Sequence, residues 1–226
     1  MTVYKYGKEE ASVILIQPVG DHDINLMEEE AAAIKRLTKM DFGLFAVKVD
    51  NWNADLSPWQ APAVFGNEAF GDGAVHTLDV ILQLCLDKER KYYIGGYSLA
   101  GLFALWASYQ TGVFSGTAAA SPSMWFPGFL PYMKEHEIRS KAVYLSLGDR
   151  EEKTKNPVMC TVGDCIRKAH AYLAGQGTEC TLEWNAGNHF KEPEMRTAKA
   201  FAWVMKEQKE HFWRINHGRE ISGRRS

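Results

Sequence analysis

The sequence is short of the features that mark repetitive, disulfide-rich or metal-stapled chains. Only 4 of its 226 residues are cysteine and 8 are proline, and no segment repeats at a fixed period. The cysteines form no CxxC pair, so their spacing excludes the usual zinc motifs and a small disulfide scaffold, and we expect reduced thiols. With 46% apolar residues, a chain of this length can instead build one complete hydrophobic core.

The sequence also lacks an excess of charge and a long apolar run. Its 26 basic and 28 acidic side chains give a formal net charge of -2, which is too balanced to attract nucleic acid by electrostatics alone. No apolar run approaches the roughly 20 residues that span a bilayer, and the first residues, MTVYKYGKEE, lack the apolar core of a secretory signal. We therefore expect no nucleic-acid partner, no membrane partner and a cytoplasmic location.

What is present is an alternation of short apolar runs with helical patterns. Because the runs are continuously apolar, they predict strands that are buried on both faces of a mostly parallel, twisted sheet. This pattern is typical of an α/β fold, a three-layer α/β/α sandwich whose ligands bind at the carboxyl ends of the strands. The strands are predicted at Thr2–Tyr6, Val13–Ile16, Leu44–Val49, Tyr92–Ile94, Gly116–Ala120, Ala142–Leu147 and Cys180–Trp184.

Helical spacing of apolar residues fills the segments between these runs. It places Leu37 and Val75 on the apolar faces of the first two helices. No linker divides residues 1–206, which we predict to be a single domain, and residues 207–226 form a polar tail. That tail is predicted to be a surface segment or a subunit contact, which leaves a homo-oligomer open. The helices are predicted at Met27–Met40 and Ala74–Leu86, from Asn156 to Gly175, and from Glu192 to about Lys206.

The segment KYYIGGYSLAGLFA has the composition of a nucleophile elbow. A strand runs into glycines, then Ser98, then a helix of small residues. Gly96 and Ala100 leave room for the sharp turn that lifts a serine hydroxyl above the sheet, although the pattern is GxSxA rather than GxSxG. A phosphate loop would need a Gly-Lys-Ser/Thr ending and a dinucleotide loop would need GxGxxG, and both are missing. A glycine turn with an incidental serine is the remaining alternative.

A serine nucleophile needs a base and a carboxylate, and suitable residues follow the last two strands. His189 lies in the loop after Cys180–Trp184, and three acids follow Gly148. We favour Glu151 because three residues of turn let it reach back, then Asp149, which can cap the turn, then Glu152. The order serine, acid, histidine is the one found in α/β-hydrolase sheets.

The oxyanion formed on a serine adduct requires backbone amide donors. The residue after the nucleophile, Leu99, supplies one, and Val19 is the predicted second because Pro18 has no amide hydrogen. The adjoining Asp21-His22-Asp23 could suggest a metal site, but adjacent side chains diverge and no HxxxH accompanies them, so we expect no metal. His22 is predicted to contact substrate at the rim.

These segments together resemble the esterase D-like family of the α/β-hydrolase superfamily. The resemblance covers about Val13 to Met205 and rests on IGGYSLAGLFALW, AAASPSMWF, YLSLGDREE, NAGNHF and DLSPWQAPAVFGNEAFGDGA. It implies a serine esterase that cleaves a small-molecule carboxylic ester through an acyl-enzyme on Ser98, with His189 as general base, an acid in the turn at 149–152 and no cofactor. An acyltransferase and a non-catalytic binding protein of the same fold stay open as alternatives.

The room between the predicted strands also bears on substrate choice. The connection from Ala120 to Ala142 is too short for the large helical cap of many lipases, so an open site is expected. Trp125 and Trp52, with the nearby Trp59, follow strand ends and are predicted to wall an aromatic cleft. Ordinary packing of these tryptophans is the alternative.

Overall fold

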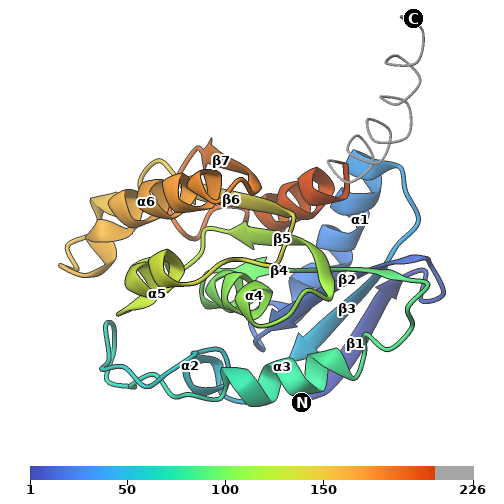
Figure 1. The fold of residues 1–226 in the computed structure, drawn as a ribbon, viewed down its shortest axis with the longest axis horizontal. Helices are drawn as coiled ribbons and strands as arrows, with labels where there is room; N and C mark the ends of the chain where they lie inside the picture. Colours follow the sequence, from blue (N-terminus) through green and yellow to red (C-terminus); the bar gives the residue numbers. More distant parts are fainter. Residues whose placement is uncertain (207–226) are drawn as a thin grey trace, which may run out of the picture.

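A computed structural model describes residues 1–206, and the tail predicted at 207–226 lies outside the described residues. All seven predicted strands form, and they make one sheet in the order β1-β3-β2-β4-β5-β6-β7 (Figure 1). Every pairing is parallel except that of β1 with β3. The strands are β1 (Thr2–Gly7), β2 (Val13–Val19), β3 (Gly43–Lys48), β4 (Lys91–Tyr97), β5 (Phe114–Ala120), β6 (Ala142–Gly148) and β7 (Glu179–Asn185).

Burial of the strands follows their place in the sheet. All seven residues of β2 and of β6 are buried, as continuously apolar central strands should be. The antiparallel strand β1 lies at one edge and is mostly exposed or half-buried, which fits its polar composition. The carboxyl ends of the six parallel strands therefore gather along one side of the sheet, where the predicted site residues follow β4, β6 and β7.

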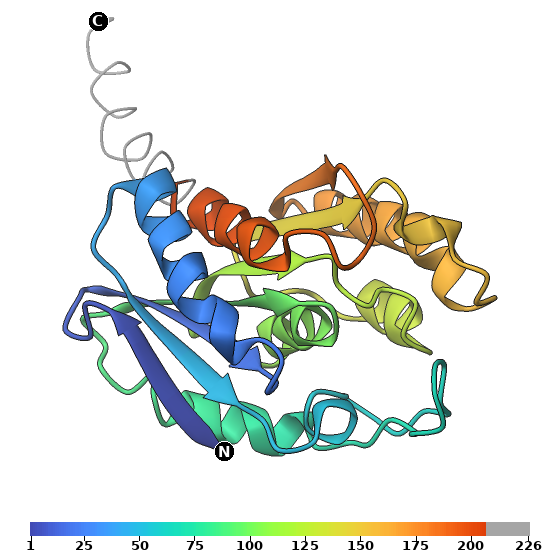
Figure 2. The ribbon, with the colours of Figure 1, turned by 180° about the vertical axis from the view of Figure 1, so that it is seen from behind.

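Helices cover both faces of this sheet, which gives the expected three-layer α/β/α sandwich. On one face lie α1 (Met27–Thr38) and the helical residues 193–206, which run beside each other in Figure 2. Ile34 and Phe201 from these two helices pack with Leu15 of the sheet. The helices on the other face are α3 (Ala74–Leu82), α4 (Leu99–Gln110), α5 (Phe129–Glu135) and α6 (Val162–Gly175) (Figure 1).

Several helix boundaries and faces differ from the sequence-based expectation. Leu37 and Val75, predicted to face inward, are 49% and 56% exposed. The buried face of α1 instead contains Met27, Glu30 and Ile34. Because one of these residues is charged, the pattern of apolar residues alone does not identify this face. The helix predicted from Asn156 to Gly175 begins later, at Val162. The Asn156 side chain instead accepts hydrogen bonds from the amides of Val158 and Met159, and a short 3-10 turn, Met159–Thr161, leads into α6.

Two short helices lie in the connections between strands. α2 (Trp52–Asp55) and α5 were not predicted, because four and seven residues are too few to show a helical period. Between β5 and β6, the described chain contains only α5 and short loops, so there is no large cap over the strand ends. Among residues 1–206, no helix has the length and apolar character needed to cross a membrane.

Candidate active site

Ser98 occupies a sharp turn between β4 and α4. Its φ of 57° and ψ of -121° are strained for a residue with a side chain, at a cost of about 1–3 kcal/mol. Three backbone bonds fix this conformation: the Ser98 amide donates to Ala120, while the Ser98 carbonyl accepts from Leu102 and Ser123. The turn holds the hydroxyl above the carboxyl ends of the strands.

The close packing of the turn explains its small residues. A Cβ on Gly96 would lie 2.7 Å from the Cβ of Ala100 and 2.9 Å from its carbonyl carbon, so this glycine cannot be replaced without a shift of the backbone. Ala100 itself is accommodated with its side chain fully buried. The alanine in the GxSxA pattern is therefore compatible with a formed elbow.

The structure brings Ser98, His189 and Glu151 together in one hydrogen-bonded chain. The Ser98 hydroxyl lies 3.0 Å from His189 Nε2, and His189 Nδ1 lies 2.6 Å from Glu151 Oε2. A carboxylate accepts hydrogen bonds, so the imidazole carries its hydrogen on Nδ1 and leaves Nε2 free to accept from the serine. The Ser123 hydroxyl, 3.4 Å from that of Ser98, offers a second polar contact.

Glu151 is buried and fully engaged. Its second oxygen, Oε1, accepts hydrogen bonds from the Gly148 amide at 2.7 Å and the Ser121 hydroxyl at 2.8 Å. Burial raises the pKa of this carboxyl, but the hydrogen bond and charge of His189 and the two donors to Oε1 outweigh it and hold the pKa below its ordinary value. Glu151 is therefore an anion that is oriented from both sides.

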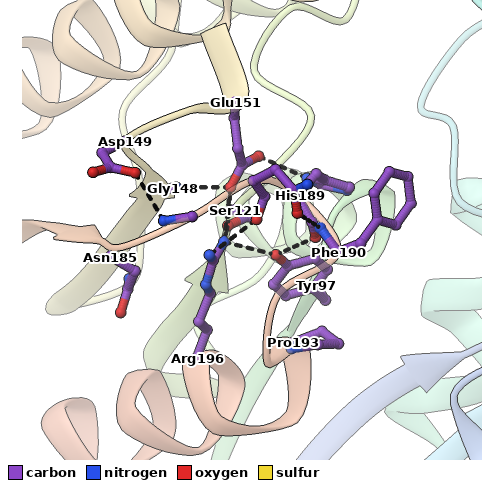
Figure 3. A network of polar contacts seen from close by, with 12 residues as sticks. Tyr97, Ser121, Gly148, Asp149, Glu151, Asn185, His189, Phe190, Pro193 and Arg196 are labelled. Atoms are coloured by element: carbon purple, nitrogen blue, oxygen red, sulfur yellow. Dashed lines mark hydrogen bonds and ion pairs between the residues drawn. The ribbon is translucent and has the colours of Figure 1, made fainter. Parts of the chain in front are cut away.

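The two competing acids have other partners. Asp149 Oδ1 accepts a hydrogen bond of 2.8 Å from the Gly187 amide, so Asp149 ties the loop after β6 to the loop that carries His189 (Figure 3). Glu152 pairs with the partly exposed Arg167 at 3.3 Å, away from the histidine. Of the three acids in the turn, Glu151 is the one that the fold directs at His189.

Sequence reasoning missed Arg196, which lies at the centre of the same network. Its guanidinium forms an ion pair of 2.9 Å with Glu151 Oε1 and donates to Tyr97, Ser121 and two loop carbonyls (Figure 3). The side chain is only 3% exposed. One signal was available: Arg196 stands four and eight residues before the apolar Ala200 and Val204, which puts a charge on the buried stripe of the helix.

The two predicted oxyanion donors fare differently. The amide of Leu99 opens α4, where backbone amides have no partner within the helix. Val19 lies in β2, and its carbonyl accepts from Val49 at 3.0 Å beyond the end of β3. Since the N–H and C=O of one strand residue point to the same neighbour, the Val19 amide faces β3 and is turned away from β4 and Ser98.

The next residue, Gly20, is better oriented than Val19. Along β2 the backbone groups alternate between neighbours, and the Ser12 carbonyl accepts from Lys91 on the β4 side. The same alternation directs the Gly20 amide to that side, where it donates to Asp23 Oδ2 at 2.9 Å. Burial raises the pKa of the Asp23 carboxyl above its ordinary value.

A cleft of about 540 Å³ opens over Ser98 and is lined mainly by apolar surface. Trp52 and Trp125, both predicted there, do line it, and so does His22, whose ring centroid lies 5.0 Å from that of Trp52. Phe65 and Phe190 were not predicted and complete the aromatic wall. Trp59 lies elsewhere: its Nε1 donates to Pro127 and its ring packs on Phe126, so its role is structural.

The side chains of Asp21, His22 and Asp23 do not converge on one point. Asp21 pairs with Lys48, whereas Asp23 turns back to the Gly20 amide and also lies 3.4 Å from His22 Nε2. In the described part of the chain, no cluster of three or more His, Cys, Asp or Glu side chains has the arrangement of a metal site.

Comparison with known proteins gives structural likeness only. No protein-family model matches the chain, and no curated protein matches its sequence. An IroE-like serine hydrolase from Shewanella oneidensis superposes with a TM-score of 0.72 at 14% identity, over 90% of this chain and 75% of that one. The siderophore hydrolase EstA from Aspergillus nidulans gives 0.58 at 16% identity, over 86% and 82%.

A third solved structure, the enterobactin esterase FES from Shigella flexneri, gives a TM-score of 0.63 at 12% identity, over 91% of this chain and 55% of that one. The chain has the α/β-hydrolase fold. The fold that the sequence motifs predicted is thereby confirmed. In an α/β-hydrolase sheet of this kind, Ser98, Glu151 and His189 follow three parallel strands at their carboxyl ends, where ligands bind.

Proposed function

We propose that this protein is a serine esterase that hydrolyses a small-molecule carboxylic ester. The observation that carries the proposal is the continuous hydrogen-bonded chain from the Ser98 hydroxyl through His189 to the buried Glu151. The elbow conformation of Ser98 and the aromatic cleft above it supply independent support. The names of the similar structures, which describe hydrolases and esterases, agree with it.

In the proposed reaction, His189 moves one proton between oxygen atoms. As Ser98 Oγ attacks the ester carbonyl carbon, Nε2 takes the hydroxyl proton, and the carbonyl oxygen becomes an oxyanion. The adduct then breaks its bond to the alcohol oxygen, which receives the proton from Nε2 and leaves as the free alcohol. Water attacks the remaining acyl-enzyme by the same route and releases the carboxylic acid.

Glu151 acts on the histidine and not on the ester. Its Oε2 accepts a hydrogen bond from His189 Nδ1, 2.6 Å away, which fixes the tautomer that can accept from serine, and its negative charge stabilises the imidazolium. The amide of Leu99 is the first oxyanion donor in this proposal. The Gly20 amide replaces the predicted Val19 amide as the second oxyanion donor. In this step the oxyanion takes the place of the Asp23 carboxylate as the acceptor of the Gly20 hydrogen bond.

The cleft favours an ester with an aromatic or bulky apolar group. Trp52, Phe65, Trp125 and Phe190 offer flat apolar faces around the serine. FES was crystallised with 2,3-dihydroxy-N-benzoyl-glycine, an aromatic ligand, which agrees with this preference. We therefore propose aryl or aryl-acyl esters as the first substrates to test.

Turnover of p-nitrophenyl esters and labelling by a fluorophosphonate probe test the proposal directly. We expect release of p-nitrophenol and covalent label on Ser98, both absent in Ser98→Ala. A wild-type protein that is folded yet neither labelled nor active on a panel of alkyl and aryl esters would refute it. Product analysis with an added alcohol acceptor separates hydrolysis from acyl transfer, because a transferase yields the new ester in place of the acid.

A further inference from the structure

Arg196 contacts residues at the carboxyl ends of four neighbouring strands, β4 to β7. Its guanidinium nitrogens lie 2.9 Å from Glu151 Oε1, 3.0 Å from the Tyr97 hydroxyl and 3.2 Å from the Ser121 hydroxyl. They also donate to the carbonyls of Ala186 at 3.3 Å and Asn188 at 3.0 Å, in the loop that leads to His189. These partners follow β4, β5, β6 and β7, and Arg196 itself stands on the helical residues 193–206.

The burial of this cation needs an explanation. Arg196 is the one lysine or arginine among residues 1–206 that the fold buries. Removing a guanidinium from water is costly unless every donor finds a partner, and Glu151 is itself only 4% exposed. In the proposed mechanism, the carboxylate of the triad interacts with the imidazole alone and needs no second cation. The buried charge of Arg196 beside Glu151 therefore has no role in that mechanism.

We infer that Arg196 is a positioning residue of the proposed triad. It holds Glu151 and the His189 loop in a fixed position relative to each other, and it shares the negative charge of Glu151 with the imidazole. The inference rests on the proposed esterase function. The planar guanidinium suits this role because its fixed fork of donors reaches a carboxylate, two hydroxyls and two carbonyls at once. A lysine has three donors on one nitrogen and cannot span the same partners.

The shared charge has a defined electrostatic consequence. With Arg196 on Oε1 and His189 on Oε2, each cation reduces the attraction that Glu151 exerts on the other. Removing the Arg196 charge would therefore strengthen the attraction between Glu151 and a protonated His189.

Other charged and titratable groups lie on the elements packed around the pair, and each must be held constant in a test. They are Tyr97 at the end of β4, Asp149 and Arg150 in the turn after β6, His22 and Asp23 beyond β2, and Lys191 in the histidine loop. A substitution at Arg196 leaves all of these residues in place and removes a direct contact of Tyr97 alone among them, the hydrogen bond that its hydroxyl accepts from the guanidinium.

An NMR titration of the His189 ring in the ligand-free protein tests the charge effect without any turnover. In Arg196→Met, we expect the midpoint of proton uptake by the pair to move up by about one pH unit relative to wild type. Lys199→Met is the matched control, since it removes a cation one turn away whose partners are Glu183 and Asn185, and its midpoint should stay at the wild-type value. If Arg196→Met does not fold, Arg196→Gln takes its place.

Arg196→Lys tests the positioning effect, because it keeps the charge and loses the fork. Its titration midpoint should stay near that of wild type, while kcat on an aryl ester falls at least about ten-fold with little change in KM. An unshifted midpoint in the neutral variant would overturn the charge effect, and wild-type kcat in Arg196→Lys would overturn the positioning effect. Since the titration needs no substrate, failure of the esterase proposal would appear separately, as absence of turnover in wild type.

Discussion

The Tyr97 hydroxyl donates a 2.7 Å hydrogen bond to the backbone carbonyl of His189. Tyr97 immediately precedes Ser98, so one side chain links the backbone of the nucleophile turn to that of the histidine loop across 92 positions of sequence. The two rings also pack, with centroids 5.0 Å apart. The distance between the Ser98 hydroxyl and the imidazole therefore depends on contacts that His189 makes with Tyr97.

Tyr97→Phe tests this link. The variant leaves a buried carbonyl with one partner fewer, and we expect the free energy of unfolding to fall by about 1–2 kcal/mol in urea denaturation. On an aryl ester, kcat should fall several-fold with KM nearly unchanged, because the loop loses alignment rather than substrate contacts. Tyr4→Phe, at a 38% exposed position, is the control and should change neither quantity. Equal behaviour of the two variants would show that the link is unimportant.

The identity of the triad acid can be decided by three amide substitutions. Glu151→Gln keeps the shape of the side chain and removes the charge that fixes the His189 tautomer, so we expect kcat to fall by about 10³- to 10⁴-fold. Asp149→Asn should lose roughly ten-fold, because it weakens the bond that holds Gly187. Glu152→Gln, whose partner is Arg167, should match wild type. A larger loss in Glu152→Gln than in Glu151→Gln would contradict the assignment.

The strained backbone of Ser98 predicts that the stability of variants at this position depends on the residue introduced, while their activity is lost in each case. Glycine adopts a φ of 57° readily. The free energy of unfolding of Ser98→Gly, measured by urea denaturation, should therefore exceed that of Ser98→Ala by about 1 kcal/mol. Both variants should lack esterase activity. Pairing them removes the contribution of the lost hydroxyl, since neither has it. A less stable glycine variant would mean that the turn is not strained.

Glu30 predicts how stability varies with pH. This carboxyl on α1 is 2% exposed, and burial raises its pKa well above the ordinary value, although its bond to Gln17 opposes the shift. As pH rises through the ordinary glutamate pKa, the unfolded chain releases its proton first, so the native state loses stability until its own pKa is passed. Glu30→Gln should therefore be more stable than wild type at pH 8 and close to it at pH 4, as measured by urea denaturation. A constant difference across this range would refute the raised pKa.

The aromatic wall predicts a selective effect on binding. Phe190 lines the cleft, is 86% exposed and lies edge-on to the His189 ring at 5.6 Å. Phe190→Ala should raise KM for an aryl ester by about three- to ten-fold, the range of one aromatic contact, and change KM for a short alkyl ester less. Leu86→Ala, at a 70% exposed position away from the cleft, controls for loss of surface apolar area. Equal changes in KM for both esters would contradict an aromatic contact.

Much of the site could be anticipated because its residues follow strands in a fixed order. The seven apolar runs predicted the strands of the sheet. The glycines around Ser98 and the order of the later strands narrowed the base to His189 and the acid to Asp149, Glu151 or Glu152, and the fold directs Glu151 at His189. The second oxyanion donor was harder, because whether Val19 or Gly20 faces β4 depends on a strand register that one sequence does not reveal.

Arg196 and Glu30 escaped prediction for a different reason. Each is a charged residue on the buried side of a helix, where an apolar pattern treats it as an interruption. Their burial depends on partners far away in sequence: Glu151 for Arg196, and Gln17 for Glu30. The predicted inward position of Leu37 failed for the same reason, since the buried stripe of α1 runs through Glu30.

The contacts of Arg196 also set the order in which the protein can become competent during its synthesis. The turn at Ser98 can form once β5 and the residues up to Ser123 have left the ribosome, but Glu151 and the histidine loop gain their shared anchor only when Arg196 emerges, 98 residues after Ser98. Protein chains are synthesised and begin to fold from the N-terminus. A nascent chain that already contains Ser98 in its turn therefore still lacks Arg196, which contacts the ends of the later strands. In the proposed mechanism, Ser98 therefore stays inactive until all seven strands have been synthesised.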